Sequence, residues 1–120
     1  GTPYKTLSSN HVKHPCTIWA ASSIHNASWL LYHGLMLCEE YEFRYKTMIA
    51  CYDSLLAAAR IFPEGDLNKI TPFTRAMPEE LKLDLTIDTF TAYKKYIASK
   101  PWVANNYEKA PFRKPDWIAI

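Results

Sequence analysis

The chain has 120 residues, of which 48% are hydrophobic, and only three are glycine. Fourteen Lys and Arg against twelve Asp and Glu leave a formal net charge of +2, so charge alone selects no class of partner. This composition argues against disordered and collagen-like chains and makes a turn-rich β fold less favoured. We therefore predict an all-α fold: a compact single domain over residues 1–120, with a long irregular loop and an aromatic carboxyl-terminal strap.

Along the chain, residues 1–13 lack periodicity and predict an extended arm, followed by a helical core over 14–100. Pro15 favours the start of a helix of about two turns. Ser22 or Ser23 is expected to cap a long helix from Ile24 to near Tyr45, because apolar residues recur there every three or four positions. Gly34 predicts a close approach to another helix, since glycine otherwise costs a helix about 1 kcal/mol.

The second half of the core contains two further helices. Apolar spacing predicts one over residues 47–61, ended by the Pro63 to Asp66 turn. Residues 66–83 are expected to form a long ordered loop with a helical turn at 78–81. A fourth helix with a threonine hydroxyl cap, Thr86 or Thr89, should end by Lys100, and residues 101–120 should form the strap.

The apolar residues of these segments predict one core. The large side chains expected to be buried are Trp19, Trp29, Leu31, Leu35, Tyr41, Met77, Tyr93 and Trp102. Three cysteines, Cys16, Cys38 and Cys51, lie among apolar neighbours and indicate reduced thiols rather than disulfides. Asn26-Ala27-Ser28 matches the N-glycosylation pattern inside a predicted helix, and we interpret the match as chance.

Histidines provide the first candidate site. His11 and His14 have a spacing that allows both imidazoles to bind one metal, but without a third ligand a capping or polar-contact role is favoured, and we predict no metal site and no cofactor. His25 and His33 lie about two turns apart on the long helix, where partly buried, hydrogen-bonded histidines are expected, with a shared functional face as the alternative.

Charged residues provide the other candidates. Glu40 and Arg44 are spaced for an exposed ion pair, whereas proton transfer would require a buried carboxylate. Lysines and arginines interleave with aromatic residues from Lys94 to Trp117, the combination that contacts phosphates and stacks on bases. The alternative is that the rings fill the core and the cations keep the surface soluble.

Five blocks of sequence, in order, resemble an uncharacterised family of phage and bacterial proteins. They are His14-Pro15-Cys16-x-x-Trp19, Asn26-x-x-Trp29-Leu30, Glu40-Tyr41-x-x-Arg44-Tyr45, Ala76-Met77-Pro78-Glu79-Glu80 and Ala92-Tyr93-Lys94-x-Tyr96. The resemblance spans about residues 4–117, and that family is remotely similar to phage pyrimidine-dimer DNA glycosylases. This chain departs from the family at Ala21-Ser22-Ser23 and Met48-Ile49, where the family carries more polar residues, and it starts after a helix that the family places first.

The resemblance implies a phage-type, DNA-associated protein on a glycosylase-like helical scaffold that acts in base excision or DNA modification. In glycosylases of that kind an amino-terminal amine and a carboxylate do the chemistry, so Gly1 and Glu40 are the catalytic candidates. The nucleic-acid-binding candidates are His11, His14, Arg44, Lys94, Lys95, Arg113 and Lys114. Whether the chain is itself an enzyme stays open, and the alternative is a non-catalytic protein-interaction or structural module.

Partners and location follow from the same observations. DNA is the expected partner, together with a second copy of the chain or a separately encoded protein that covers the place of the family's first helix. The sequence has no apolar run long enough for a membrane span, and its start is not that of a secretory signal. We expect a cytoplasmic protein, in the host cytoplasm if a phage encodes it.

Overall fold

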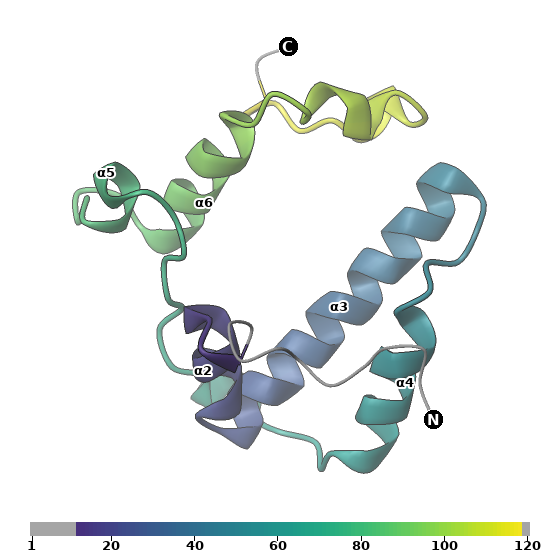
Figure 1. The fold of residues 1–120 in the computed structure, drawn as a ribbon, viewed down its shortest axis with the longest axis vertical. Coiled ribbons are helices and arrows are strands. Elements are labelled where there is room, and N and C mark those ends of the chain that lie inside the picture. The colour runs from purple at the N-terminus through teal and green to yellow at the C-terminus, as the bar shows by residue number, and fades with distance from the viewer. Residues whose placement is uncertain (1–11, 119–120) are drawn as a thin grey trace. The chain divides into compact units, whose positions relative to one another are not determined.

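The computed structural model describes residues 12–118, and within them it contains five α-helices, three 3₁₀ turns and no strand (Figure 1). This confirms the all-α prediction. Contacts group the chain into an N-terminal unit that ends at Phe73 and a C-terminal unit that begins at Thr74. The division into one domain over 1–120 stays a prediction, and residues 1–11 of the expected arm lie outside the described residues.

In the N-terminal unit, two helices begin where the sequence predicts. Helix α2 spans Pro15–Ala21 with proline in its first turn, and His14 Nδ1 accepts a 3.1 Å hydrogen bond from the Cys16 amide. Helix α3 spans Ile24–Tyr45, and the Ser23 hydroxyl accepts from the Asn26 amide at 3.1 Å. Both caps satisfy amides that a helix leaves without an internal partner.

Helix α4 spans Tyr52–Ile61 and packs along α3 (Figure 1). It begins five residues later than Thr47, where the prediction placed it, because Lys46 adopts a left-handed conformation (φ 58°) and the following residues turn the chain back. A Cβ built on Gly34 would lie 3.0 Å from Leu55 Cδ1, which confirms the predicted close approach. The 3₁₀ turn η1, Leu67–Lys69, lies in the segment predicted as loop.

The C-terminal unit contains α5 (Glu79–Lys82) and α6 (Thr89–Ala98), followed by the 3₁₀ turns η2 (Ala104–Tyr107) and η3 (Pro111–Arg113) of the strap. The predicted hydroxyl cap of α6 is wrong. Asp88 caps it instead, with its Oδ1 accepting from the Thr91 amide at 2.6 Å, because this carboxylate directly precedes the helix. The Thr86 hydroxyl donates to Asp84 Oδ1 at 2.5 Å.

The buried apolar side chains are mostly small and include none of the large ones predicted. They are Ala20 and Cys38 in the N-terminal unit, and Ala92, Val103, Ala110 and Ile118 in the C-terminal unit. Seven of the eight large residues expected in the core are half-buried, and Trp102 is 50% exposed, so its predicted burial is wrong. Trp102 follows Pro101 in a turn, and in this turn the side chain of the next residue, Val103, is buried instead of the indole.

Candidate nucleic-acid interface

Of the two predicted catalytic residues, the structure describes only Glu40. Gly1 lies outside the described residues. Glu40 Oε2 is 2.7 Å from Arg44 Nε, the i,i+4 ion pair expected from the sequence, and the side chains are 30% and 17% exposed respectively. Arg44, a predicted nucleic-acid contact, is therefore engaged on its own helix, and the proposed roles of both residues stay predictions.

The histidines have structural contacts. His11 lies outside the described residues, and His14 caps α2, the kind of role favoured for it from the sequence. Within residues 12–118 no group of three His, Cys, Asp or Glu side chains is placed to hold a metal ion. His25 Nδ1 accepts from the Asp66 amide at 2.9 Å, whereas exposed His33 stacks on Trp29 with centroids 4.8 Å apart.

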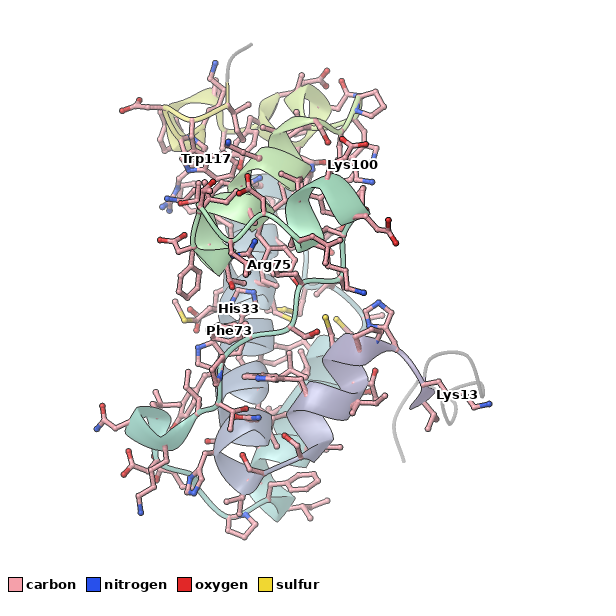
Figure 2. All side chains as sticks on the ribbon, turned by 90° about the vertical axis from the view of Figure 1, so that its left-hand side faces the viewer. Lys13, His33, Phe73, Arg75, Lys100 and Trp117 are labelled. Carbon is pink, nitrogen blue, oxygen red and sulfur yellow. The ribbon has the colours of Figure 1, made fainter. Side chains whose placement is uncertain are left out.

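An aromatic cluster joins α2, α3 and the end of the N-terminal unit. Trp19 meets Trp29 edge-on at 5.7 Å, and Phe73 lies 4.9 Å from Trp19 and 4.6 Å from Trp29. His33 and Phe73, both labelled in Figure 2, each lie against Trp29. Because these rings are half-buried against one another, they hold the unit together rather than offering free faces for stacking.

Asn26 is a buried polar centre that the sequence analysis did not identify. It is 0% exposed, and the two hydrogens of its Nδ2 are shared among three acceptors, the Trp19 carbonyl at 2.9 Å, Ser22 Oγ at 3.0 Å and Thr71 Oγ1 at 2.8 Å. Its Oδ1 accepts from the Thr71 amide at 3.0 Å. One side chain thus joins two helices to a loop 45 residues away, and its burial fits the interpretation of the glycosylation match as chance.

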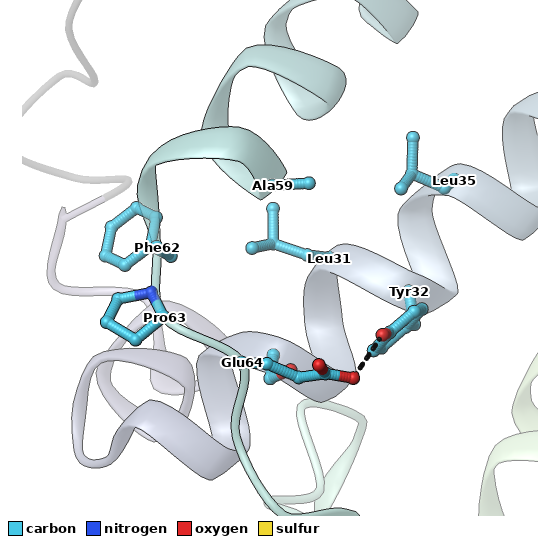
Figure 3. A pocket seen from close by; sticks show the side chains of 8 residues that line it. Leu31, Tyr32, Leu35, Ala59, Phe62, Pro63 and Glu64 are labelled. Atoms are coloured by element: carbon cyan, nitrogen blue, oxygen red, sulfur yellow. Dashed lines mark hydrogen bonds between the residues drawn. The ribbon is translucent and has the colours of Figure 1, made fainter.

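A cavity of about 160 Å³ lies between α3 and α4 (Figure 3). At its rim the Tyr32 hydroxyl donates to Glu64 Oε1 at 3.0 Å, and this hydrogen bond raises the pKa of Tyr32. Its apolar wall consists of Leu31, Leu35, Ala59, Phe62 and Pro63. None of these residues is among the predicted site residues.

In the C-terminal unit, Arg75 organises the segment between α5 and α6. Its guanidinium donates to the carbonyls of Leu81, Asp84 and Ile87 at 2.9, 2.7 and 2.6 Å, and to Thr89 Oγ1 at 3.3 Å. Tyr93 fixes the segment that precedes α5, because its hydroxyl donates to the Thr74 carbonyl at 2.6 Å and accepts from the Ala76 amide at 3.0 Å. Bonds from a cation to backbone carbonyls leave no sequence motif by which they could be predicted.

The predicted cations Lys94 and Lys95 are both exposed on α6. Lys94 Nζ lies 6.0 Å from the ring centroid of Trp117, so the helix and the end of the strap come together there. Lys100 Nζ donates to the Tyr96 hydroxyl at 3.0 Å and lies over the same ring. Figure 2 shows Lys100 and Trp117 in this unit. Arg113 is exposed and Lys114 half-buried at and after η3.

Charge is distributed unevenly within the C-terminal unit. Residues 74–93 carry two basic and four acidic side chains, a net charge of −2, whereas residues 94–118 carry six basic and two acidic ones, a net charge of +4. Exposed rings accompany the positive part: Trp102 is 50% exposed and Trp117 38%. We call residues 94–118 the basic strap. It combines cations with accessible aromatic faces. The N-terminal unit also has one such pair, because Lys46 Nζ lies 4.9 Å from the ring centroid of exposed Phe43.

Asp84 and Asp88 border the basic strap. The pKa of Asp84 is lowered chiefly by the hydrogen bond from the Thr86 hydroxyl, and that of Asp88 chiefly by the bond from the Thr91 amide. The positive charges of Lys95 and Lys94 lower the same two pKa values further. Both carboxylates are therefore ionised at neutral pH, and their charges offset part of the positive charge of Lys94 and Lys95.

Comparison with protein-family models, curated proteins and solved structures gives no match to this chain. Among the described helices, none has both the length and the apolar character needed to cross a membrane.

Proposed function

We propose that this chain is a DNA-associated protein that binds strands with unpaired bases through the basic strap. The observation that carries the proposal is the placing of Lys94 Nζ 6.0 Å from the Trp117 ring, beside exposed Lys95. An ammonium next to an exposed indole offers a phosphate contact and a stacking face within the span of one nucleotide. The resemblance to an uncharacterised phage and bacterial family, itself remotely similar to phage DNA glycosylases, supports the same partner.

Unpaired bases are favoured because the exposed faces are aromatic. Stacking of a base on a tryptophan contributes about 1–3 kcal/mol, and a base inside a duplex is not available for it. Lysines alone would bind duplex and single strands through the same phosphates. A net charge of +4 over residues 94–118 is modest, so the rings must supply part of the affinity.

Fluorescence anisotropy with labelled single-stranded, mismatched and duplex oligonucleotides tests this proposal, with salt varied between about 50 and 200 mM. We expect tighter binding to the single strand, with affinity that falls as salt rises. The double variant Lys94→Gln, Lys95→Gln should flatten the dependence of log K on log salt by about 0.7 for each phosphate that the variant no longer neutralises. Lys82→Gln on α5 is the matched control, because Lys82 is exposed in the acidic part of the same unit.

The stacking component has its own test. Trp102→Ala should weaken single-strand binding about 5- to 150-fold, the loss expected for one stacked base, whereas Trp102→Phe should retain most of it. We expect both variants to keep the wild-type melting midpoint, because the Trp102 side chain is 50% exposed, and this midpoint is the control for folding. Absence of binding to every oligonucleotide at low salt would overturn the proposal.

The enzymatic form of the proposal is base excision, and it rests on the resemblance alone. In it the amine of Gly1, in a protein whose mature amino terminus is that residue, attacks the sugar C1′, a bond forms between nitrogen and C1′, and the glycosidic bond breaks as the base leaves. Glu40 transfers protons as the product collapses to an imine. Borohydride reduces such an imine to a stable covalent adduct, so denaturing electrophoresis after borohydride treatment with damaged and abasic DNA is the test. If no adduct forms with any substrate of that panel, the chain binds DNA without this chemistry.

An interaction module is the second candidate, and exposed apolar side chains on α3 favour it. Met36 is 67% and Leu37 56% exposed, and the two are adjacent on one helix. A second copy of the chain would bury them. Light scattering at a protein concentration of tens of micromolar tests this self-association. A mass near 13.9 kDa would contradict it. A doubled mass would support it if the double variant Met36→Gln, Leu37→Gln returns to the mass of a single chain.

A further inference from the structure

Two thiols of the N-terminal unit lie against each other across the α3–α4 pair. Cys38 Sγ, in the middle of α3, is 3.9 Å from Cys51 Sγ, at the start of α4, and 13 positions separate them in sequence. Cys38 is 2% exposed, and Cys51 is half-buried. All three described cysteines are free thiols, as predicted.

The packing around this pair keeps the two sulfurs close. The left-handed Lys46 turns the chain back toward α3, and Gly34 allows Leu55 of α4 to approach the α3 backbone. A disulfide has its sulfur atoms about 2.0 Å apart, so closing the present gap requires a movement of about 2 Å. The side-chain movement that brings the sulfurs together is rotation about the Cα–Cβ bonds.

We propose that Cys38 and Cys51 are an oxidative modification site, at which a peroxide converts the two thiols into one intramolecular disulfide that ties α3 to the start of α4. The Cys51 thiolate attacks one peroxide oxygen, the O–O bond breaks, and hydroxide or water leaves, so that Cys51 becomes a sulfenic acid. The Cys38 sulfur then attacks Cys51 Sγ, and a second water leaves. Two thiols lose two electrons and two protons, and one hydrogen peroxide becomes two waters.

The surroundings assign the order of these steps. Burial raises the pKa of the Cys38 thiol, and the hydrogen bond and charge of Cys51 raise it further. Cys38 therefore stays protonated while Cys51, which solvent reaches, reacts first. The shielded Cys38 is held at contact distance and resolves the sulfenic acid before a second oxidation.

A cross-link between residues 38 and 51 closes a short loop and restricts the unfolded chain. The chain-entropy argument for a loop of this length gives a rise in melting temperature of about 10 °C for the oxidised protein. The N-terminal unit would then resist unfolding more strongly under oxidising conditions, and a thiol reductant would reverse the effect.

The test uses the full chain with Cys16→Ser, treated with stoichiometric hydrogen peroxide, then alkylated and digested with trypsin without reduction. Trypsin cleaves at Lys13, Arg44, Lys46 and Arg60, so the two cysteines fall in separate peptides, residues 14–44 and 47–60. We expect these peptides to be linked, with the loss of two hydrogen atoms, and dithiothreitol to separate them and reverse the thermal shift. In the control Cys51→Ala, Cys38 should stay unoxidised.

Two other outcomes overturn the proposal. One is a sulfenic or sulfinic acid on Cys51 that persists without a linked peptide, and the other is a disulfide between two chains, seen as a doubled mass. The unsubstituted chain provides a second measurement should Cys16→Ser fold poorly. Chymotrypsin cleaves after Trp19 and Trp29, which separates Cys16 from Cys38 and keeps the assignment of the link unambiguous.

Discussion

Replacing Asn26 by alanine should destabilise the N-terminal unit more than its small change in volume suggests. The substitution removes the hydrogen-bonding contacts to four partner atoms from a side chain that is 0% exposed. At about 1 kcal/mol each, their loss sets an upper value near 4 kcal/mol. Trp19 O retains hydrogen bonds from Ser22, and the exposed Thr71 reaches water, so part of the loss is compensated. We expect a decrease of about 2–3 kcal/mol in the free energy of unfolding.

Urea unfolding followed by tryptophan fluorescence measures this change. Trp102→Phe and Trp117→Phe form the background, so that Trp19 and Trp29, which pack beside the Asn26 network, supply the signal. Asn68→Ala is the matched control, because Asn68 is an exposed asparagine of the same unit and should change stability by less than about 0.5 kcal/mol. A midpoint for Asn26→Ala equal to that of the control would refute the view that this side chain joins the two helices to the loop.

Further predictions concern single positions. Ser54→Ala should raise the free energy of unfolding by about 0.5–2 kcal/mol, because Ser54 Oγ is buried without a hydrogen-bond partner among the described residues. A lower melting midpoint in thermal unfolding would show a hidden partner. Gly65→Ala should lower the free energy of unfolding by about 2 kcal/mol or more, since its Cβ would lie 2.7 Å from the Ile24 carbonyl oxygen. Gly34→Ala should lower it far less, because the new Cβ meets only the flexible end of Leu55, and equal losses in urea unfolding would contradict this steric reasoning. Asp88→Ala should lower the melting midpoint at pH 7 and Asp88→Ser should largely preserve it. The folded-state pKa of Asp88 is below the usual 3.8, so its contribution is present above that pH and is lost as the pH falls through the lowered value. A wild-type advantage that does not decrease as the pH is lowered through the acid range would be inconsistent with a charged cap.

The local helix signals were readable from the sequence because each is contained within a few residues. Pro15, Ser23 and the three- and four-residue spacing after Ile24 located α2 and α3, and Gly34 marked the packing of a second helix. A cap or a glycine acts on its own turn, so neighbouring residues suffice to identify it. The Glu40–Arg44 pair follows from the same geometry of one helix face.

Only the tertiary structure decided which side chains meet across long stretches of sequence. The hydrogen-bonding contacts of Asn26, the carbonyls gathered around Arg75 and the approach of Cys38 to Cys51 depend on separate elements packing together. Hydrophobicity predicted a buried Trp102, yet the turn after Pro101 buries Val103 and leaves the indole half-exposed. A residue type states what a side chain prefers, whereas its burial and its partners depend on where the backbone carries it, and so the rings and cations of the basic strap acquire their arrangement only in the fold.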